Sequence, residues 1–125
     1  MASTSSFPIR YGLFRPLLTV LGAGPRHSGV EIADGCLRAR MGWMFRAEIP
    51  LGAVVSATPY SGFVGGIGVH GGRGRWLVNG AARGLVTIAI EPAARARVLG
   101  VPVRLRMLRV SLESPERLLA ALGRP

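Results

Sequence analysis

Arginine is the residue type in this chain with the clearest chemistry, because all sixteen basic side chains are arginines and none is lysine. Arg38, Arg40 and Arg46 alternate with apolar residues, which predicts that they share one face of a strand pair. Arg104, Arg106 and Arg109 follow one another along the last expected strand, near the C-terminus. A guanidinium group binds phosphate or carboxylate through two parallel hydrogen bonds, so neighbouring strands that join these arginines would form an anion-binding stripe. The alternative is a solvated sheet face without a ligand.

A second candidate anion site is the glycine-rich segment Gly71-Gly72-Arg73-Gly74-Arg75. Consecutive glycines expose backbone N–H groups and the two arginines add positive charge, a combination that can hold a phosphate. The alternative is a hairpin turn in which glycine supplies positive φ and the arginines face water. The segment lacks the Gly-Lys-Ser/Thr of the phosphate loop found in nucleotide hydrolases.

No combination of residues in the sequence specifies a reaction. The single aspartate, Asp34, lies in a predicted turn, and the five glutamates are spread along the chain. A serine or cysteine nucleophile needs a positioned base, and neither His27 nor His70 stands in a motif that provides one. The two histidines and Cys36 also lack the spacing of a zinc site. We therefore expect no catalytic residues, no metal and no cofactor.

The composition indicates one compact domain with a strongly basic surface. The 125 residues are 49% apolar, which is enough to fill a core and too apolar for a disordered chain. Sixteen basic residues against six acidic ones give a net charge of +10, which attracts polyanions. Genome composition is an alternative source of the arginines, since arginine and alanine codons can be GC-rich.

The single cysteine excludes an internal disulfide and agrees with a reducing compartment. The first residues show no charged and apolar pattern of a secretory signal, and the apolar stretch from Leu13 is interrupted by Arg15 and Pro16. We therefore expect a cytoplasmic protein, which a basic face would allow to associate peripherally with the inner face of the membrane.

Short strands separated by glycine and proline are the elements that must position the arginines. The strands are expected at Val30–Asp34, Leu37–Ile49 with a turn at Gly42, Ala53–Thr58, Ile67–His70, Trp76–Val78, Leu85–Ile90 and Arg104–Leu112. Asp34-Gly35 and Asn79-Gly80 are tight-turn signals. Pro92–Gly100 is expected to be a connector with one helical turn.

The residues adjacent in sequence predict a buried position for one tryptophan and an exposed position for the other. Trp43 shares the parity of the apolar residues between Leu37 and Ile49, which predicts that it lies in the core. Trp76 stands beside Arg75 and is the aromatic residue expected to be exposed for stacking.

The C-terminus carries the best-defined helix signal. Ser114 is a favourable N-cap, Pro115 suits the first helical position and Gly123 is the expected stop. Leucines in this segment form one apolar stripe, and a helix this short is stable only when it is docked. At the other end, residues 1–28 are expected to be a lead-in, with a short strand or an extended segment at Phe7–Tyr11 and a short helix at Leu13–Leu21. Residues 29–125 are expected to be the folded domain.

This order of elements resembles the pleckstrin-homology-like (PH-like) superfold and, more narrowly, uncharacterised PH-like domain proteins of actinobacteria. The resemblance is carried by three blocks: LRARMGWMFRAEIP from Leu37, GRWLVNG from Gly74 and LRVSLESPERLL from Leu108. It implies a mainly β barrel of about seven antiparallel strands capped by one C-terminal helix, with a binding role and no enzyme activity. Relatives that hold inositol phosphates use a basic loop between the first two strands, where this chain has the acidic turn Asp34-Gly35.

We therefore expect a non-enzymatic binding module whose partner is an anionic membrane surface or an acidic protein. The expected contact residues are Arg38, Arg40, Arg46, Arg73, Arg75, Arg104 and Arg106. One alternative is a nucleic-acid-binding protein that uses the same arginines with Trp76. Another is a protein–protein adaptor that pairs a strand edge with a peptide, in which the charge is incidental. The sequence specifies no oligomeric state.

Overall fold

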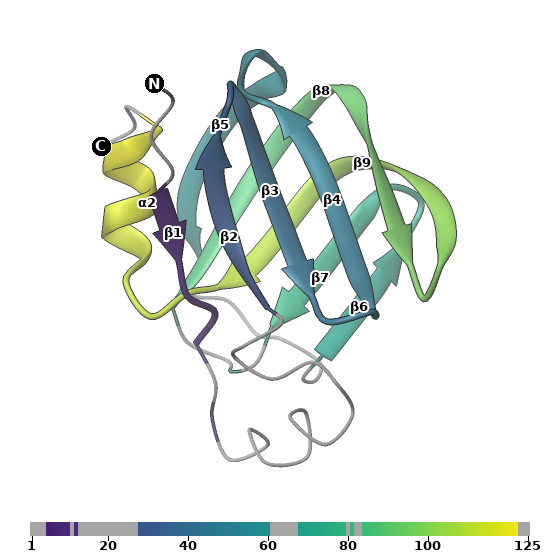
Figure 1. Ribbon diagram of the computed structural model, residues 1–125, viewed down its shortest axis with the longest axis horizontal. Helices are drawn as coiled ribbons and strands as arrows, with labels where there is room; N and C mark the ends of the chain where they lie inside the picture. Colours follow the sequence, from purple (N-terminus) through teal and green to yellow (C-terminus); the bar gives the residue numbers. More distant parts are fainter. Residues whose placement is uncertain are drawn as a thin grey trace.

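The computed structural model of the protein describes residues 5–10, 12, 28–60, 68–79, 81 and 84–122. Within these residues the chain forms nine strands and one C-terminal helix (Figure 1). The strands are β1 (Ser5–Phe7), β2 (Ser28–Ala33), β3 (Cys36–Met41), β4 (Phe45–Pro50), β5 (Val54–Tyr60), β6 (Gly68–Gly72), β7 (Arg75–Asn79), β8 (Leu85–Val98) and β9 (Val101–Ser111). The helix is α2 (Pro115–Ala121), and a short 3-10 turn, η2 (Leu51–Ala53), connects β4 to β5. The expectation of a mainly β fold with one C-terminal helix is confirmed.

All nine described strands belong to one sheet with the order β1-β2-β3-β4-β8-β9-β7-β6, and β5 pairs with β8 outside this path. In Figure 1, β2, β3 and β4 lie in front of β9 and β7 and cross them, so the sheet folds over itself into two layers. The path ends at β1 and at β6, which do not pair with each other, so the sheet is open.

Three features of the expected barrel are therefore wrong for the described residues. The strands number nine rather than about seven, partly because β1 forms within the expected lead-in and pairs with β2. The sheet does not close. The pairing of β7 with β9 is parallel, whereas the expected barrel is antiparallel throughout.

The long strand β8 joins the two layers. Its first part, from Leu85 to Ile90, pairs with β5, and its last part, from Arg95 to Val98, pairs with β4. Its register with β9 shifts between Ala89 and Ala94, where the irregularity allows the strand to change direction. The expected connector with a helical turn at Pro92–Gly100 is thus wrong, because the alternating sequence up to Val98 has partners on both sides and continues as a strand.

The core lies between the layers and is built from alternating residues. In β3 and β4 the residues of one parity are buried and those of the other parity are mostly exposed, as the sequence predicts. The buried set of this hairpin is Leu37, Ala39, Met41, Phe45, Ala47 and Ile49. From the other layer, Ile88 of β8 and the β9 residues Leu105 and Leu108 are fully buried and belong to the same cluster. One continuous core therefore holds the two layers together.

Trp43 does not belong to this core, contrary to the expectation from parity. Its side chain is 60% exposed. Met41 pairs with Phe45, and the Met44 N–H donates to the Met41 carbonyl at 3.1 Å, so Gly42, Trp43 and Met44 form a turn. The alternation of a strand does not continue through a turn, which explains the error and confirms that Gly42 splits the segment into two strands.

The C-terminal helix is docked as predicted. Ser114 occupies the N-cap position, although its side chain makes no capping hydrogen bond, and Pro115 is the first helical residue. Leu118 and Leu119 are buried, and Leu122 packs partly buried against the core. The helix expected at Leu13–Leu21 lies outside the described residues, as do His27, Gly80 and Gly123.

Arg10 fastens the N-terminal segment to the end of β9. Its Nε donates to the Leu112 carbonyl and its Nη2 to the Glu113 carbonyl, both at 3.0 Å. The Arg10 backbone forms two further hydrogen bonds with Ser111, one of them donated by the serine hydroxyl. This arginine therefore has a structural role, and it leaves little room around the nearby Gly84, whose carbonyl accepts from the Leu112 N–H at 2.8 Å.

We expect the substitution Gly84→Ala to destabilise the protein. A methyl group there would overlap the Leu112 carbonyl oxygen, and the φ of 70° at this position is unfavourable for alanine. The free energy of unfolding should fall by about 2–4 kcal/mol in urea denaturation. Gly52→Ala is the matched control, because a methyl group at Gly52 meets nothing within 4 Å. Equal stability of the two variants would contradict the close packing of Gly84 against the end of β9.

Candidate anion-binding face

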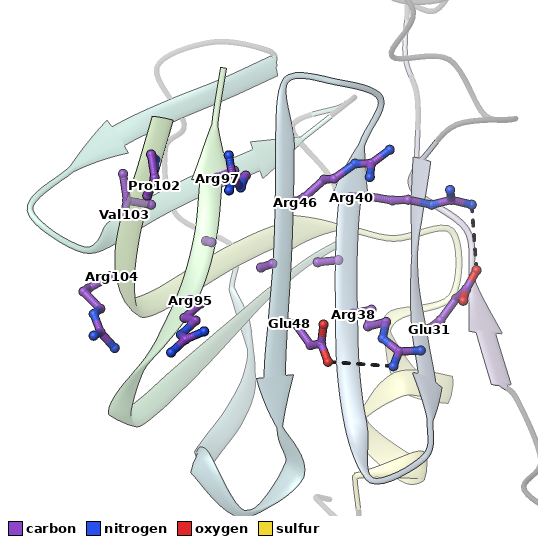
Figure 2. Close-up of a pocket in the computed structure, with 13 residues that line it drawn as sticks. Glu31, Arg38, Arg40, Arg46, Glu48, Arg95, Arg97, Pro102, Val103 and Arg104 are labelled. Atoms are coloured by element: carbon purple, nitrogen blue, oxygen red, sulfur yellow. Dashed lines mark ion pairs between the residues drawn. The ribbon is translucent and has the colours of Figure 1, made fainter. Parts of the chain in front are cut away.

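The arginines of β3 and β4 meet those of β8 and β9 on the outer side of the sheet. We call this surface the basic face (Figure 2). It consists of Arg38, Arg40, Arg46, Arg95, Arg97 and Arg104. The cross-strand register arranges these side chains in two rows that run across the strands.

The first row alternates in charge over most of its length. Its members in order are Glu31, Arg38, Glu48, Arg95 and Arg104. Arg38 Nη2 lies 3.8 Å from Glu48 Oε1, so opposite charges face each other in the middle of the row. The row ends with two arginines in register on β8 and β9, which have no carboxylate between them.

The second row contains arginines on three successive strands. Arg40 of β3 is in register with Arg46 of β4, and Arg46 is in register with Arg97 of β8. Like charges directly opposite each other destabilise a sheet, so this row is unfavourable for the protein by itself. Its one ion pair among the described residues joins Arg40 Nη2 to Glu31 Oε1 at 3.8 Å, at the β2 end of the row.

The two ion pairs are weak, and they involve only two of the six arginines of the basic face. The side chains of Arg38 and Glu48 are 44% and 62% exposed, and an ion pair exposed to this extent contributes little to stability. Arg46, Arg95 and Arg104 make no side-chain hydrogen bond or ion pair with any other described residue. Arg97 has one long hydrogen bond, 3.4 Å to the Gly100 carbonyl. The basic face therefore keeps most of its guanidinium groups available to a ligand.

The basic face is hollowed. It surrounds an open depression of about 930 Å³, which Glu31 and Glu48 also line together with Pro102 and Val103. Figure 2 shows the arginine side chains standing around this depression, and they come from β3, β4, β8 and β9. A depression lined by six arginines and two glutamates suits an anion better than a neutral ligand.

A smaller hollow of about 440 Å³ adjoins the first, since Val103 and Arg104 line both. Arg73, Gly74, Trp76 and Arg106 complete it. The glycine-rich segment is a hairpin turn between β6 and β7, with positive φ at Arg73 and Gly74. The Gly74 carbonyl accepts from the N–H groups of Arg106 and Met107 and so fixes this turn against β9.

The structure brings most of the predicted arginines together. Arg38, Arg40, Arg46 and Arg104 share the larger hollow, and Arg73 and Arg106 border the smaller one. Arg75 is exposed and lines neither hollow.

Sequence reasoning misses Arg95 and Arg97, which complete the basic face. Proline and alanine favour a connector in this segment, although the period-two pattern Ala94-Arg95-Ala96-Arg97-Val98 is the signal of a strand with one wet side. Arg109, by contrast, has a structural role: its Nε donates to the Thr87 hydroxyl at 2.9 Å, and its guanidinium lies over the Tyr60 ring.

Trp76 is not the exposed stacking residue that the sequence predicts. It is in register with the buried Leu108 and packs partly buried against the core. The exposed tryptophan of the described chain is Trp43.

The described residues contain no group of three or more histidine, cysteine, aspartate or glutamate side chains that could hold a metal ion. Among the same residues, no helix has the length and apolarity needed to cross a membrane.

We expect Arg46→Glu to stabilise the free protein. The substitution replaces two like-charge cross-strand pairs by two opposite-charge pairs, each of which contributes roughly 0.2–1 kcal/mol. The melting temperature should therefore rise at low ionic strength, and the gain should shrink at high salt because the charges are screened. Arg46→Gln, which only removes repulsion, should fall between the wild type and Arg46→Glu. A lower melting temperature for both variants would show that Arg46 is stabilised within the free protein.

Comparison with known proteins gives no relative for this chain. No protein-family model matches it, and neither a curated protein nor a solved structure does so.

Proposed function

We propose that the protein is a non-enzymatic, PH-like binding module that engages an anionic membrane surface through the basic face. The observation that carries this proposal is the second row, in which Arg40, Arg46 and Arg97 lie in register on three neighbouring strands. An anion placed over this row would replace repulsion between guanidinium groups by attraction. The second row thus destabilises the free protein through like-charge repulsion, and the same row gains the most favourable electrostatic energy when an anion binds.

The chemistry of the basic face supports binding rather than catalysis. Its carboxylates, Glu31 and Glu48, are ion-paired with arginines. Guanidinium groups hold phosphate and carboxylate oxygens by paired hydrogen bonds, and they stay charged at any physiological pH. The PH-like assignment is supported by the β-rich sheet and the C-terminal helix, while the open sheet and the parallel pair of β7 with β9 depart from it.

A membrane fits this face better than a single-stranded nucleic acid. Recognition of single strands needs aromatic side chains between the basic residues for base stacking, and the residues that line the larger hollow include none. Each arginine close to an anionic lipid surface contributes about 1 kcal/mol of attraction. The six arginines of the basic face therefore provide substantial affinity without a specific headgroup.

Binding to vesicles tests this proposal. We expect the protein to float with vesicles of mixed phosphatidylserine and phosphatidylcholine, to do so less as salt rises, and not to float with phosphatidylcholine alone. The double variant Arg46→Gln/Arg97→Gln should weaken binding by roughly 30-fold, from two lost contacts of about 1 kcal/mol each.

The matched control is Arg75→Gln/Arg117→Gln, which removes the same charge from exposed arginines outside the basic face. An equal loss in both double variants would show that net charge, and not the basic face, drives binding. Release from anionic vesicles by a small excess of competing nucleic acid would favour the nucleic-acid alternative. Absence of binding to anionic vesicles at low salt would overturn the membrane proposal.

A further inference from the structure

Large apolar side chains are exposed at one corner of the molecule. Among the described residues, Trp43 and Val101 are each 60% exposed and Leu99 is 56% exposed. The remaining exposed large apolar residue of the described chain, Val55, lies apart from them on β5 and is 51% exposed. We call Trp43, Leu99 and Val101 the apolar corner.

Backbone pairing holds the apolar corner together. Phe45 is in register with Val98, which aligns the β3–β4 turn with the β8–β9 turn. The Leu99 N–H then donates to the Met44 carbonyl at 2.9 Å, so the two turns are directly joined. Figure 1 shows both turns at the same end of their strands, on the side of the molecule away from α2.

Neither burial nor backbone preference explains a leucine at position 99. Leu99 has a φ of 51°, in the left-handed region that favours glycine, and it is followed by Gly100 with a φ of 83°. Leu99 therefore carries two costs, one from the positive φ of a residue other than glycine and one from the exposure of an apolar side chain to water. Such residues persist where function needs them, so Leu99 points to a partner that covers it.

The apolar corner adjoins the most positive part of the basic face. Arg46 comes two residues after Met44 in the β3–β4 turn, and Arg97 precedes Leu99 by two residues. In Figure 2, Arg46 and Arg97 stand at the end of the basic face that carries the β3–β4 turn. Arg46 and Arg97 of the second row therefore lie next to the two turns.

We propose that the apolar corner inserts into the interfacial region of an anionic bilayer while the second row contacts the lipid phosphates. This inference rests on the proposed function and adds the orientation of the protein on the membrane. Tryptophan favours the headgroup level, where its ring is in an apolar layer and its N–H is hydrated. Leu99 and Val101 would reach the acyl boundary, and Arg46 and Arg97 would keep their charges at the phosphates.

Charge complementarity favours a bilayer over a second copy of this chain. A symmetric pair of apolar corners would place the second row of one copy near that of the other, and like charges across an interface are unfavourable. An anionic bilayer offers apolar volume and negative charge in adjacent layers, which matches the order of the two groups on this protein.

Tryptophan fluorescence tests the insertion. In a Trp76→Phe variant, Trp43 is the single tryptophan of the chain. Its emission should shift to shorter wavelength on phosphatidylserine-containing vesicles and should be quenched by lipids brominated near the headgroup. The difference spectrum between the wild type and Trp43→Phe gives the same information if Trp76→Phe folds poorly. An emission unchanged by vesicles that demonstrably bind the protein would overturn the proposal.

A second variant separates insertion from stability. Leu99→Gly removes the apolar side chain and suits the positive φ, so the melting temperature should stay equal or rise. Binding to anionic vesicles should nevertheless weaken roughly five- to tenfold. Val55→Ala is the matched control for an exposed apolar residue, and it should change binding less than about twofold.

The outcomes distinguish this inference from the proposed function. If the arginine variants weaken vesicle binding but Leu99→Gly binds like Val55→Ala, the basic face binds lipid without insertion and only this inference fails. If the wild type does not bind anionic vesicles at all, the proposed function fails as well. If light scattering shows a dimer that Leu99→Gly dissociates, the apolar corner is an interface between copies and the inference is wrong.

Discussion

The double pairing of β8 is the constraint on which the rest of the structure depends. One part of this strand completes the layer that contains β5, and the other part completes the layer that contains β4. The same strand pairs with β9 on both sides of the register shift between Ala89 and Ala94. Without that shift, one strand could not serve both layers. The core between the layers and the basic face outside them are consequences of the same backbone path.

The basic face illustrates a conflict between the stability of the free protein and the anion binding that we propose for it. The sheet pairs arginine with arginine at Arg40, Arg46 and Arg97, although a glutamate at the middle position would satisfy both neighbours. The adjacent first row places opposite charges side by side, as at Arg38 and Glu48. The difference between the two rows lies in their positions, because only the second row stands beside the apolar corner. Local unfavourable choices of this kind are expected at functional sites.

Much of this fold is predictable from local sequence. The alternation of buried and exposed residues in β3 and β4, the turn at Asp34-Gly35 and the helix after Ser114 all appear where the residue pattern places them. The errors come from information that is not local. Parity could not place Trp43, because turn length depends on the pairing of Met41 with Phe45. Proline and alanine in the second half of β8 predict a connector, whereas pairing with β4 and β9 makes this segment a strand. Nothing in the sequence of β7 indicates that its neighbour β9 is parallel.

The hydrogen bonds between Arg10 and the residues at the end of β9 have a consequence for how the chain folds. The hydrogen bond from its Nε to the Leu112 carbonyl joins residues 102 positions apart in the sequence. Bringing such distant segments together is costly in chain entropy and slows folding. During synthesis from the N-terminus, this contact can form only after β9 has been made. The segment around Arg10 is therefore among the last parts of the chain to reach its final position. Strands β2, β3 and β4 can pair with one another before Arg10 contacts Leu112.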